Sequence, residues 1–133
     1  MSRLLTAAVL AAGVAACAPV HDVKGERRAA AKFDAELAGL VAGPPQSCLP
    51  SQSRATVVAA RGPILLFREG RMVYANDTSG GCASLANGHD TLVTESFGAS
   101  LCRGSLAKVV DLQAGGMIRG SCVLGDFRPF RRP

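Results

Sequence analysis

Five cysteines constrain this chain more than any other feature of its sequence. Cys17 ends an apolar leader, and the other four lie 34, 20 and 20 residues apart, at Cys48, Cys82, Cys102 and Cys122. Structural zinc sites use pairs of ligands about two to four residues apart, so this spacing does not predict a metal site. In an oxidising compartment, four widely spaced cysteines predict two disulfides, and three pairings are open.

The first residues have the pattern of an export signal. Arg3 precedes an apolar run of 13 residues, Leu4–Ala16, and the chain turns polar soon afterwards, at His21. A membrane-spanning helix needs about 20 apolar residues, whereas the shorter run is typical of the centre of a signal peptide. We therefore expect residues 1–16 to be a signal peptide, in preference to a buried helix of a cytosolic protein.

The leader ends in Val14-Ala15-Ala16-Cys17, which resembles the lipobox of bacterial lipoproteins. The resemblance implies cleavage before Cys17, lipidation of its thiol and acylation of the new amino group; cleavage after Ala18 by an ordinary signal peptidase is the alternative. Several acyl chains hold a protein stably on a bilayer. Because Ala18 follows the cysteine, the resemblance favours the outer membrane. We expect a lipid-anchored protein of the cell envelope that faces the periplasm.

Export makes two disulfides the expected state of the remaining cysteines. We favour Cys48 with Cys102 and Cys82 with Cys122, because these pairs join distant segments at the ends of expected strands. Each disulfide contributes about 2–4 kcal/mol to the stability of a small domain. A reactive thiol is the alternative, and Arg103 beside Cys102 is the one feature that favours it.

The mature chain has the length of one domain and begins with two distinct zones. Residues 17–23 contain a proline and polar residues without periodicity, as in a short lipidated tether. In residues 24–42, apolar side chains recur at three- and four-residue steps from Ala30 to Val41, which predicts a helix that Gly43 ends. We expect this helix to pack on the domain rather than to lie on anionic lipid.

Short apolar runs separated by Gly, Asn and Asp follow, and they predict antiparallel strands over residues 48–128. Turn signals such as Glu69-Gly70 favour a small sheet or barrel of about five to six strands. The expected fold class is α+β, with one helix and a disulfide-bonded antiparallel β-body in a single domain, residues 24–133. The expected strands are residues 54–60, 63–68, 71–75, 91–95, 107–112 and 117–124.

Three short motifs, at residues 47–49, 98–102 and 124–130, resemble those of a family of small uncharacterised envelope proteins from alphaproteobacteria. The resemblance covers residues 44–130. Members of the family share an N-terminal export signal, one helix and a β-rich body that ends in Gly-Asp-Phe-x-Pro-aromatic. Phe130 stands at the last position, where Tyr is common. The resemblance implies the fold class and the cellular address, and it implies no catalytic residue.

No pattern in the chain predicts catalysis or a cofactor. Ser100, His89 and Asp111 are the residue types of a hydrolase triad, but nothing in the sequence brings them together, and a Gly-x-Ser-x-Gly motif is absent. His89 is expected in a solvated turn. We expect no enzyme, no cofactor and no bound metal.

Basic residues gather at the C-terminus of a chain whose net charge is +5: Arg128, Arg131 and Arg132. Export, together with a single Tyr for base stacking, argues against nucleic acid as the partner. Anionic lipid headgroups are the nearer partner for these arginines, and a solubilising tail is the alternative.

These expectations combine into one class of function. We expect a structural or binding module of the envelope that contacts the membrane through its anchor, and that also contacts another envelope protein or anionic headgroups. A periplasmic inhibitor of a cell-wall hydrolase such as lysozyme is the alternative.

Overall fold

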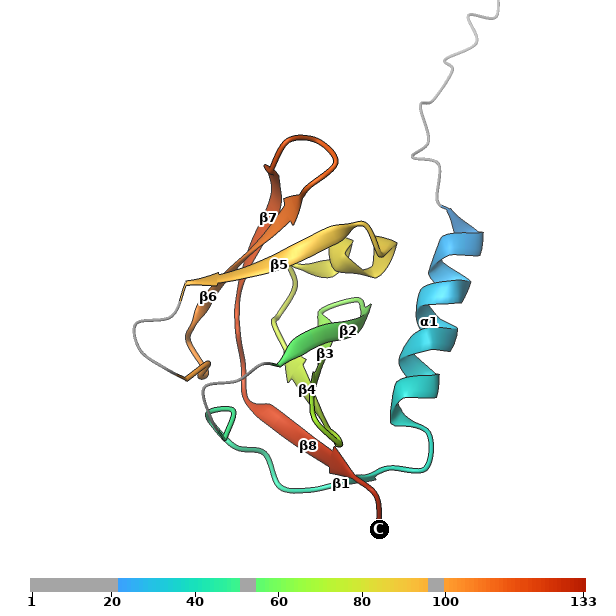
Figure 1. Ribbon diagram of the computed structural model, residues 1–133, viewed down its shortest axis with the longest axis vertical. Coiled ribbons are helices and arrows are strands. Elements are labelled where there is room, and N and C mark those ends of the chain that lie inside the picture. Colours follow the sequence, from blue (N-terminus) through green and yellow to red (C-terminus); the bar gives the residue numbers. More distant parts are fainter. Residues whose placement is uncertain (1–21, 51–54, 96–99) are drawn as a thin grey trace, which may run out of the picture.

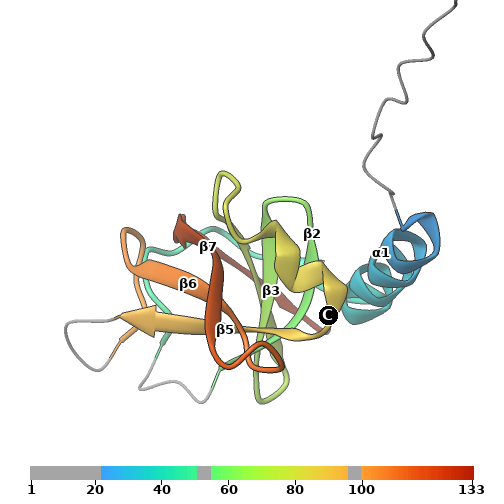
Figure 2. The same ribbon diagram turned by 90° about the horizontal axis from the view of Figure 1, so that it is seen from above.

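The computed structural model describes residues 22–50, 55–95 and 100–133. The expected signal peptide, Cys17 and nearly all of the expected tether lie outside these residues. One helix stands at one side of the domain, next to a five-stranded sheet, and a three-stranded sheet completes the body (Figures 1 and 2). The α+β class expected from the sequence is confirmed.

Helix α1 (Val23–Leu37) packs on the domain through one aromatic side chain. At its start, the carboxylate of Asp22 accepts a hydrogen bond from the backbone N–H of Gly25 at 3.0 Å, which caps the first turn. The buried face centres on Phe33, over whose ring the guanidinium of Arg61 lies at 4.2 Å. The buried residues around Phe33 belong to the five-stranded sheet: Ala59, Leu66 and Val73.

The predicted helix over residues 24–42 is too long. The helix ends at Leu37, and Gly39 follows with a φ of 71°, a left-handed conformation that commonly terminates helices. Leu40 and Val41 fit the helical period in the sequence, which explains the error. In the structure, the backbone of Val41 pairs with Arg131 instead.

The five-stranded sheet is antiparallel throughout and has the order β1-β8-β4-β3-β2. Its two edges are therefore β1 and β2. Gly62 and Gly70 occupy the two tight turns from β2 to β3 and from β3 to β4, where each has a positive φ. The strands are β1 (Val41–Ala42), β2 (Thr56–Arg61), β3 (Ile64–Glu69), β4 (Met72–Asp77) and β8 (Phe127–Arg131).

The three-stranded sheet is also antiparallel, with the order β5-β6-β7. A short 3-10 helix, η1 (Ala83–Asn87), leads into it from β4. Its strands are β5 (Asp90–Glu95), β6 (Leu106–Asp111) and β7 (Met117–Val123). Within residues 22–50, 55–95 and 100–133, the two sheets do not close on each other.

The described residues form eight strands, where five to six were expected. The six predicted runs all form strands whose ends differ by at most two residues from the prediction. The two additional strands are β1, which is only two residues long, and β8, whose Pro129 and arginines suggest a tail in the sequence. Long-range pairing makes β8 a strand, because it lies between β4 and β1.

The main hydrophobic core lies between the two sheets. Phe67 of β3 and Phe127 of β8 meet edge to face with ring centroids 5.7 Å apart. Val109 of β6 and Leu124 are fully buried in the same cluster. Both sheets therefore turn an apolar face inward, and helix α1 covers the outer face of the larger one.

Both disulfides connect segments that are distant in sequence. Cys48 pairs with Cys102, and Cys82 pairs with Cys122, across sequence separations of 54 and 40 residues. These are the pairs favoured from the sequence. Cys82 follows the five-stranded sheet and Cys122 lies in β7, so the second disulfide joins the two sheets inside the core.

A close backbone contact between β4 and the segment before β8 explains the glycine of the Gly-Asp-Phe motif. The buried side chain of Asn76 donates a hydrogen bond to the carbonyl of Gly125 and accepts one from its N–H, at 2.8 and 2.9 Å. A Cβ on Gly125 would lie 2.3 Å from the carbonyl oxygen of Asp77. Asp126 then pairs with Arg103 at the surface. The glycine of the motif therefore permits close backbone packing against β4.

We predict that Asn76→Ala lowers the free energy of unfolding by about 2–4 kcal/mol, because it leaves the N–H and carbonyl of Gly125 unpaired in the interior. Denaturant unfolding of the oxidised domain measures this change. Gln113→Ala, at an exposed turn, is the matched control and should change stability by about 0.5 kcal/mol or less. Equal stability of the two variants would contradict this role of Asn76.

Candidate functional site

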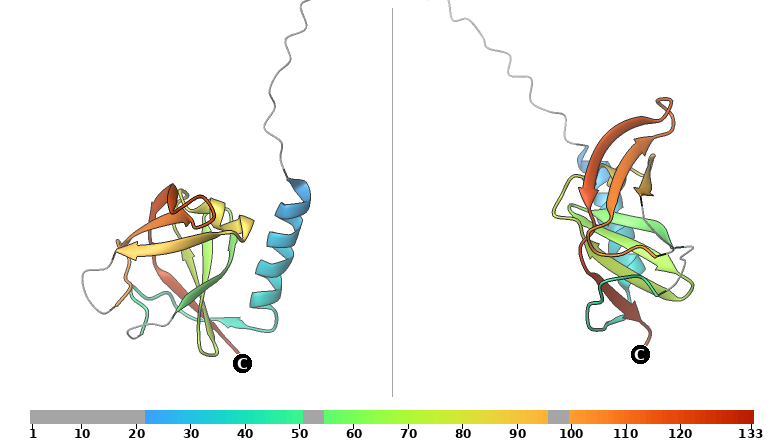
Figure 3. Two further views of the ribbon diagram at one scale, coloured as in Figure 1. Left: turned by 45° about the horizontal axis from the view of Figure 1, so that its top comes forward. Right: turned by 90° about the vertical axis from the view of Figure 1, so that its left-hand side faces the viewer.

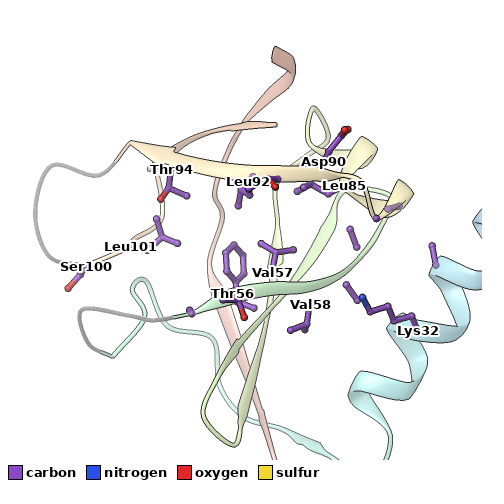
Figure 4. A pocket seen from close by; sticks show the side chains of 18 residues that line it. Lys32, Thr56, Val57, Val58, Leu85, Asp90, Leu92, Thr94, Ser100 and Leu101 are labelled. Carbon is purple, nitrogen blue, oxygen red and sulfur yellow. The ribbon is translucent and has the colours of Figure 1, made fainter. Parts of the chain in front are cut away.

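The two sheets leave an open seam between β2 and β5. Each of these strands is the edge of its sheet, and a cavity of about 680 Å³ lies between them (Figure 4). We call this the seam cavity. Helix η1 and one side of α1 contribute to its walls.

The interior of the seam cavity is apolar and its margins are polar. Val57 of β2 and Leu92 of β5 point toward one another across it, with Leu85 of η1 beside them (Figure 4). Phe67, which belongs to the main core, lines the cavity as well. The side chain of Thr94 also turns from β5 into the cavity.

Charged and hydroxyl groups mark the two ends of the seam cavity. Lys32 reaches one end from α1, and Ser100 stands at the other (Figure 4). Asp90, at the start of β5, also belongs to the lining, and one of its carboxylate oxygens is buried without a hydrogen-bond partner among the described residues. A ligand in the cavity would therefore meet apolar contacts in the middle and polar groups at both ends.

Free backbone groups face the seam cavity from both sides. Strand β2 pairs only with β3, and β5 pairs only with β6, within the parts of the chain that the structure describes. An edge strand presents a row of backbone N–H and carbonyl groups that can hydrogen-bond to another strand. The β2 edge is also irregular, because its register shifts between Val57 and Ala59.

The three residue types of a hydrolase triad do not form one catalytic group. His89 is exposed in the turn before β5, where the side chain of Asn87 accepts a hydrogen bond from the His89 N–H at 2.7 Å. Asp111 lies across from Asp90, the neighbour of His89, but its carboxylate is engaged by Arg119. Ser100 lies beyond the opposite end of β5.

Asp111 instead organises the turn between β6 and β7. One carboxylate oxygen accepts hydrogen bonds from the backbone N–H groups of Gln113 and Ala114, and the other accepts from the guanidinium of Arg119 at 2.6 Å. The Arg119 hydrogen bond, with those from the backbone, holds the pKa of Asp111 below its ordinary value. The same pair raises the pKa of Arg119.

The C-terminal arginines do not form one surface cluster. All three are exposed, and none forms an ion pair within the described residues. Arg128 and Arg131 are three residues apart on β8, so strand alternation turns them to opposite faces of the sheet. Arg132 instead lines a hollow with Arg68 and Arg71, next to the C-terminal part of α1.

The other predicted site residues divide between two groups. The four cysteines Cys48, Cys82, Cys102 and Cys122 are paired, whereas Cys17 lies outside the described residues. Among the described residues, no three His, Cys, Asp or Glu side chains lie close enough together to hold a metal ion. In the same part of the chain, no helix is long and apolar enough to cross a membrane.

The chain matches no protein family, no curated protein and no solved structure.

The seam cavity was not predicted from the sequence. The sequence offers one local signal for the cavity, and it lies in strand β5. Strand alternation assigns Leu92 and Thr94 to one face and Val93 to the other. The sequence does not indicate that β2 and β5 remain unpaired with each other.

The stabilising effect of Asp111 should depend on pH in a defined direction. Because its pKa is lowered in the folded state, the stabilisation is complete above about pH 4, the ordinary carboxyl value, and is lost as the pH falls through the lowered pKa. We predict that Asp111→Asn is less stable than the parent at neutral pH and that this difference shrinks in acid. Thermal unfolding between neutral and acidic pH measures it.

Asp34→Asn is the control for this measurement, because Asp34 forms only an exposed ion pair with Arg61. It should change stability little at neutral pH. A stability difference for Asp111→Asn that stays constant down to strong acid would contradict the assigned role of the carboxylate.

Proposed function

We propose that this chain is a lipid-anchored binding module of the bacterial cell envelope, held at Cys17 and exposed to the periplasm from the outer membrane. The lipobox-like residues Val14–Cys17 support the anchor, and they lie only a short distance before Val23, where α1 begins. Two disulfides that use all four remaining cysteines support export, because such bonds persist in oxidising compartments.

The seam cavity is the observation that carries the binding function. Extended peptides bind proteins by adding a strand to a free sheet edge, with alternate side chains placed in pockets beside it. Here two free edges, β2 and β5, border one cavity. The ligand that fits is an extended segment of another envelope protein.

The lining of the seam cavity defines the chemistry of this segment. Phe67, Leu85 and Leu92 favour an apolar side chain at its centre. Lys32 at one end favours a carboxylate there. The backbone of the segment would pair with β5, β2 or both, and this pairing demands neither a catalytic residue nor a cofactor.

Intact-mass measurement of the protein from a membrane fraction tests the anchor. We expect a chain that begins at Cys17, carries the added mass of a diacylglyceryl and an acyl group, and gains two hydrogen atoms per disulfide on reduction. Cys17→Ser is the control and should remain unlipidated. A chain that begins at Met1 with all thiols reduced would contradict both the anchor and export.

A pair of variants on adjacent residues tests the seam cavity. We predict that Thr94→Arg abolishes selection of linear peptides from a displayed random library, because its long, charged side chain would extend from β5 into the path of the peptide. Val93→Arg places the same charge on the opposite face of β5 and should retain binding. Both positions are exposed, so both variants should fold. Equal peptide binding by the two variants would contradict the assignment of the site.

Inhibition of a cell-wall hydrolase is the special case in which the bound segment belongs to an enzyme. Titration of lysozyme with the purified domain distinguishes it. Loss of lysozyme activity at stoichiometric amounts, reversed by Thr94→Arg, would assign the inhibitor function. Unchanged lysozyme activity would leave the general binding module.

A further inference from the structure

We propose that the turn between β6 and β7 contacts the surface of the bilayer in which Cys17 is anchored, so that the tether and this turn together hold the domain in one orientation. We call residues 112–118 the hairpin tip. This inference rests on the proposed lipidation of Cys17.

The hairpin tip has the composition of a segment that enters a lipid interface. Its sequence, LQAGGMI, contains no charged residue. Leu112, Met117 and Ile118 are 63%, 58% and 60% exposed, whereas an exposed turn of a water-soluble domain is commonly polar. Contact with lipid would cover these three side chains without burying a charge.

The exposed apolar surface of the domain is concentrated on the three-stranded sheet that carries the hairpin tip. Six of the eight large hydrophobic side chains that are exposed among the described residues belong to β5, β6, β7 or the hairpin tip. Within the tip, Met117 pairs with Asp111 while Ile118 pairs with Val110, so their side chains lie on opposite faces of the hairpin. Because apolar side chains project from both faces of the hairpin and are exposed, they do not pack into the core of the domain.

The base of the hairpin tip is fixed by an ion pair. Asp111 binds Arg119 across the two strands and also accepts two backbone hydrogen bonds from within the turn. The N–H of Gly116 donates to the carbonyl of Asp111 at 2.9 Å. Arg119 therefore pairs with Asp111 at the base of the tip, where Asp90 of β5 lies across from Asp111, and the turn keeps a defined shape.

The hairpin tip lies at the end of the molecule where the chain enters the domain. Along the long axis, the tip and the first turn of α1 are at the same end, and the C-terminus is at the other (Figures 1 and 3). Residues 17–22 span at most about 20 Å when extended. An anchor at Cys17 therefore keeps this end of the domain near the bilayer.

Charge at the same end suits an anionic bilayer. Lys24, Arg27 and Arg28 are exposed in the first turns of α1, and the acidic residues beside them are Asp22, which caps the helix, and Glu26. The balance is basic, so headgroup phosphates are favourable neighbours. This orientation turns the C-terminal arginines away from the anchoring bilayer.

A tryptophan at the hairpin tip tests the contact, because the chain has no native Trp. The lipidated full chain with Met117→Trp is reconstituted in vesicles of phosphatidylethanolamine and phosphatidylglycerol. We expect its emission to shift to the blue and to be quenched by brominated lipids. Arg71→Trp is the control. Arg71 is exposed in the β3–β4 turn, and the pairing of Val73 with Phe130 places this turn next to the end of β8. A tryptophan at this position should not be quenched.

The outcomes separate this inference from the proposed function. A lipidated, vesicle-bound Met117→Trp chain whose introduced tryptophan is not quenched would overturn the membrane contact and leave the anchor intact. If that chain also sediments as a dimer, the apolar tip belongs to an interface with a second copy. Recovery of the chain without lipid on Cys17 would overturn the anchor and the contact together.

Discussion

Two disulfides fix the relation between two sheets that do not close on each other. Cys82–Cys122 joins the end of the five-stranded sheet to β7 inside the main core, and Cys48–Cys102 joins the segment after β1 to the segment before β6. Each such bond limits the freedom of the unfolded chain. With these links in place, β2 and β5 can remain unpaired without loss of the fold. The disulfides and the shared core therefore hold the two sheets together beside the open seam.

The parts of the fold that depend on local pattern could be predicted from the sequence. Alternating apolar runs and turn glycines such as Gly70 identified six strands, and widely spaced cysteines indicated the two disulfides. The end of α1 was predicted incorrectly because Leu40 and Val41 fit the helical period, whereas the conformation of Gly39 and the pairing with β8 decide the outcome. Local periodicity carries no information about a distant partner strand.

The candidate site could not be predicted for the same reason. Thr94 and Leu92 are ordinary strand residues, and their position beside a cavity follows from the absence of pairing between β5 and β2 in the described parts of the chain. Strand formation also changed the interpretation of the C-terminal arginines. As a tail they would form one basic cluster, but on β8 the alternation of side chains separates Arg128 from Arg131.

The seam cavity and the hairpin tip lie in different parts of the domain. The hairpin tip lies at the end where α1 begins, whereas the seam cavity opens between β2 and β5 along the body of the domain (Figures 1 and 4). If the tip holds the domain at a bilayer as proposed, the seam cavity lies apart from the membrane-facing tip.

Hydrogen exchange of the oxidised domain tests most directly the claim that two strand edges are open. The account predicts rapid exchange for the amides of β2 and β5 that do not pair with β3 or β6, slow exchange throughout β3, and protection of the open edges when a selected peptide binds. Amides of β2 and β5 that are all as protected as those of β3 in the free domain would contradict it.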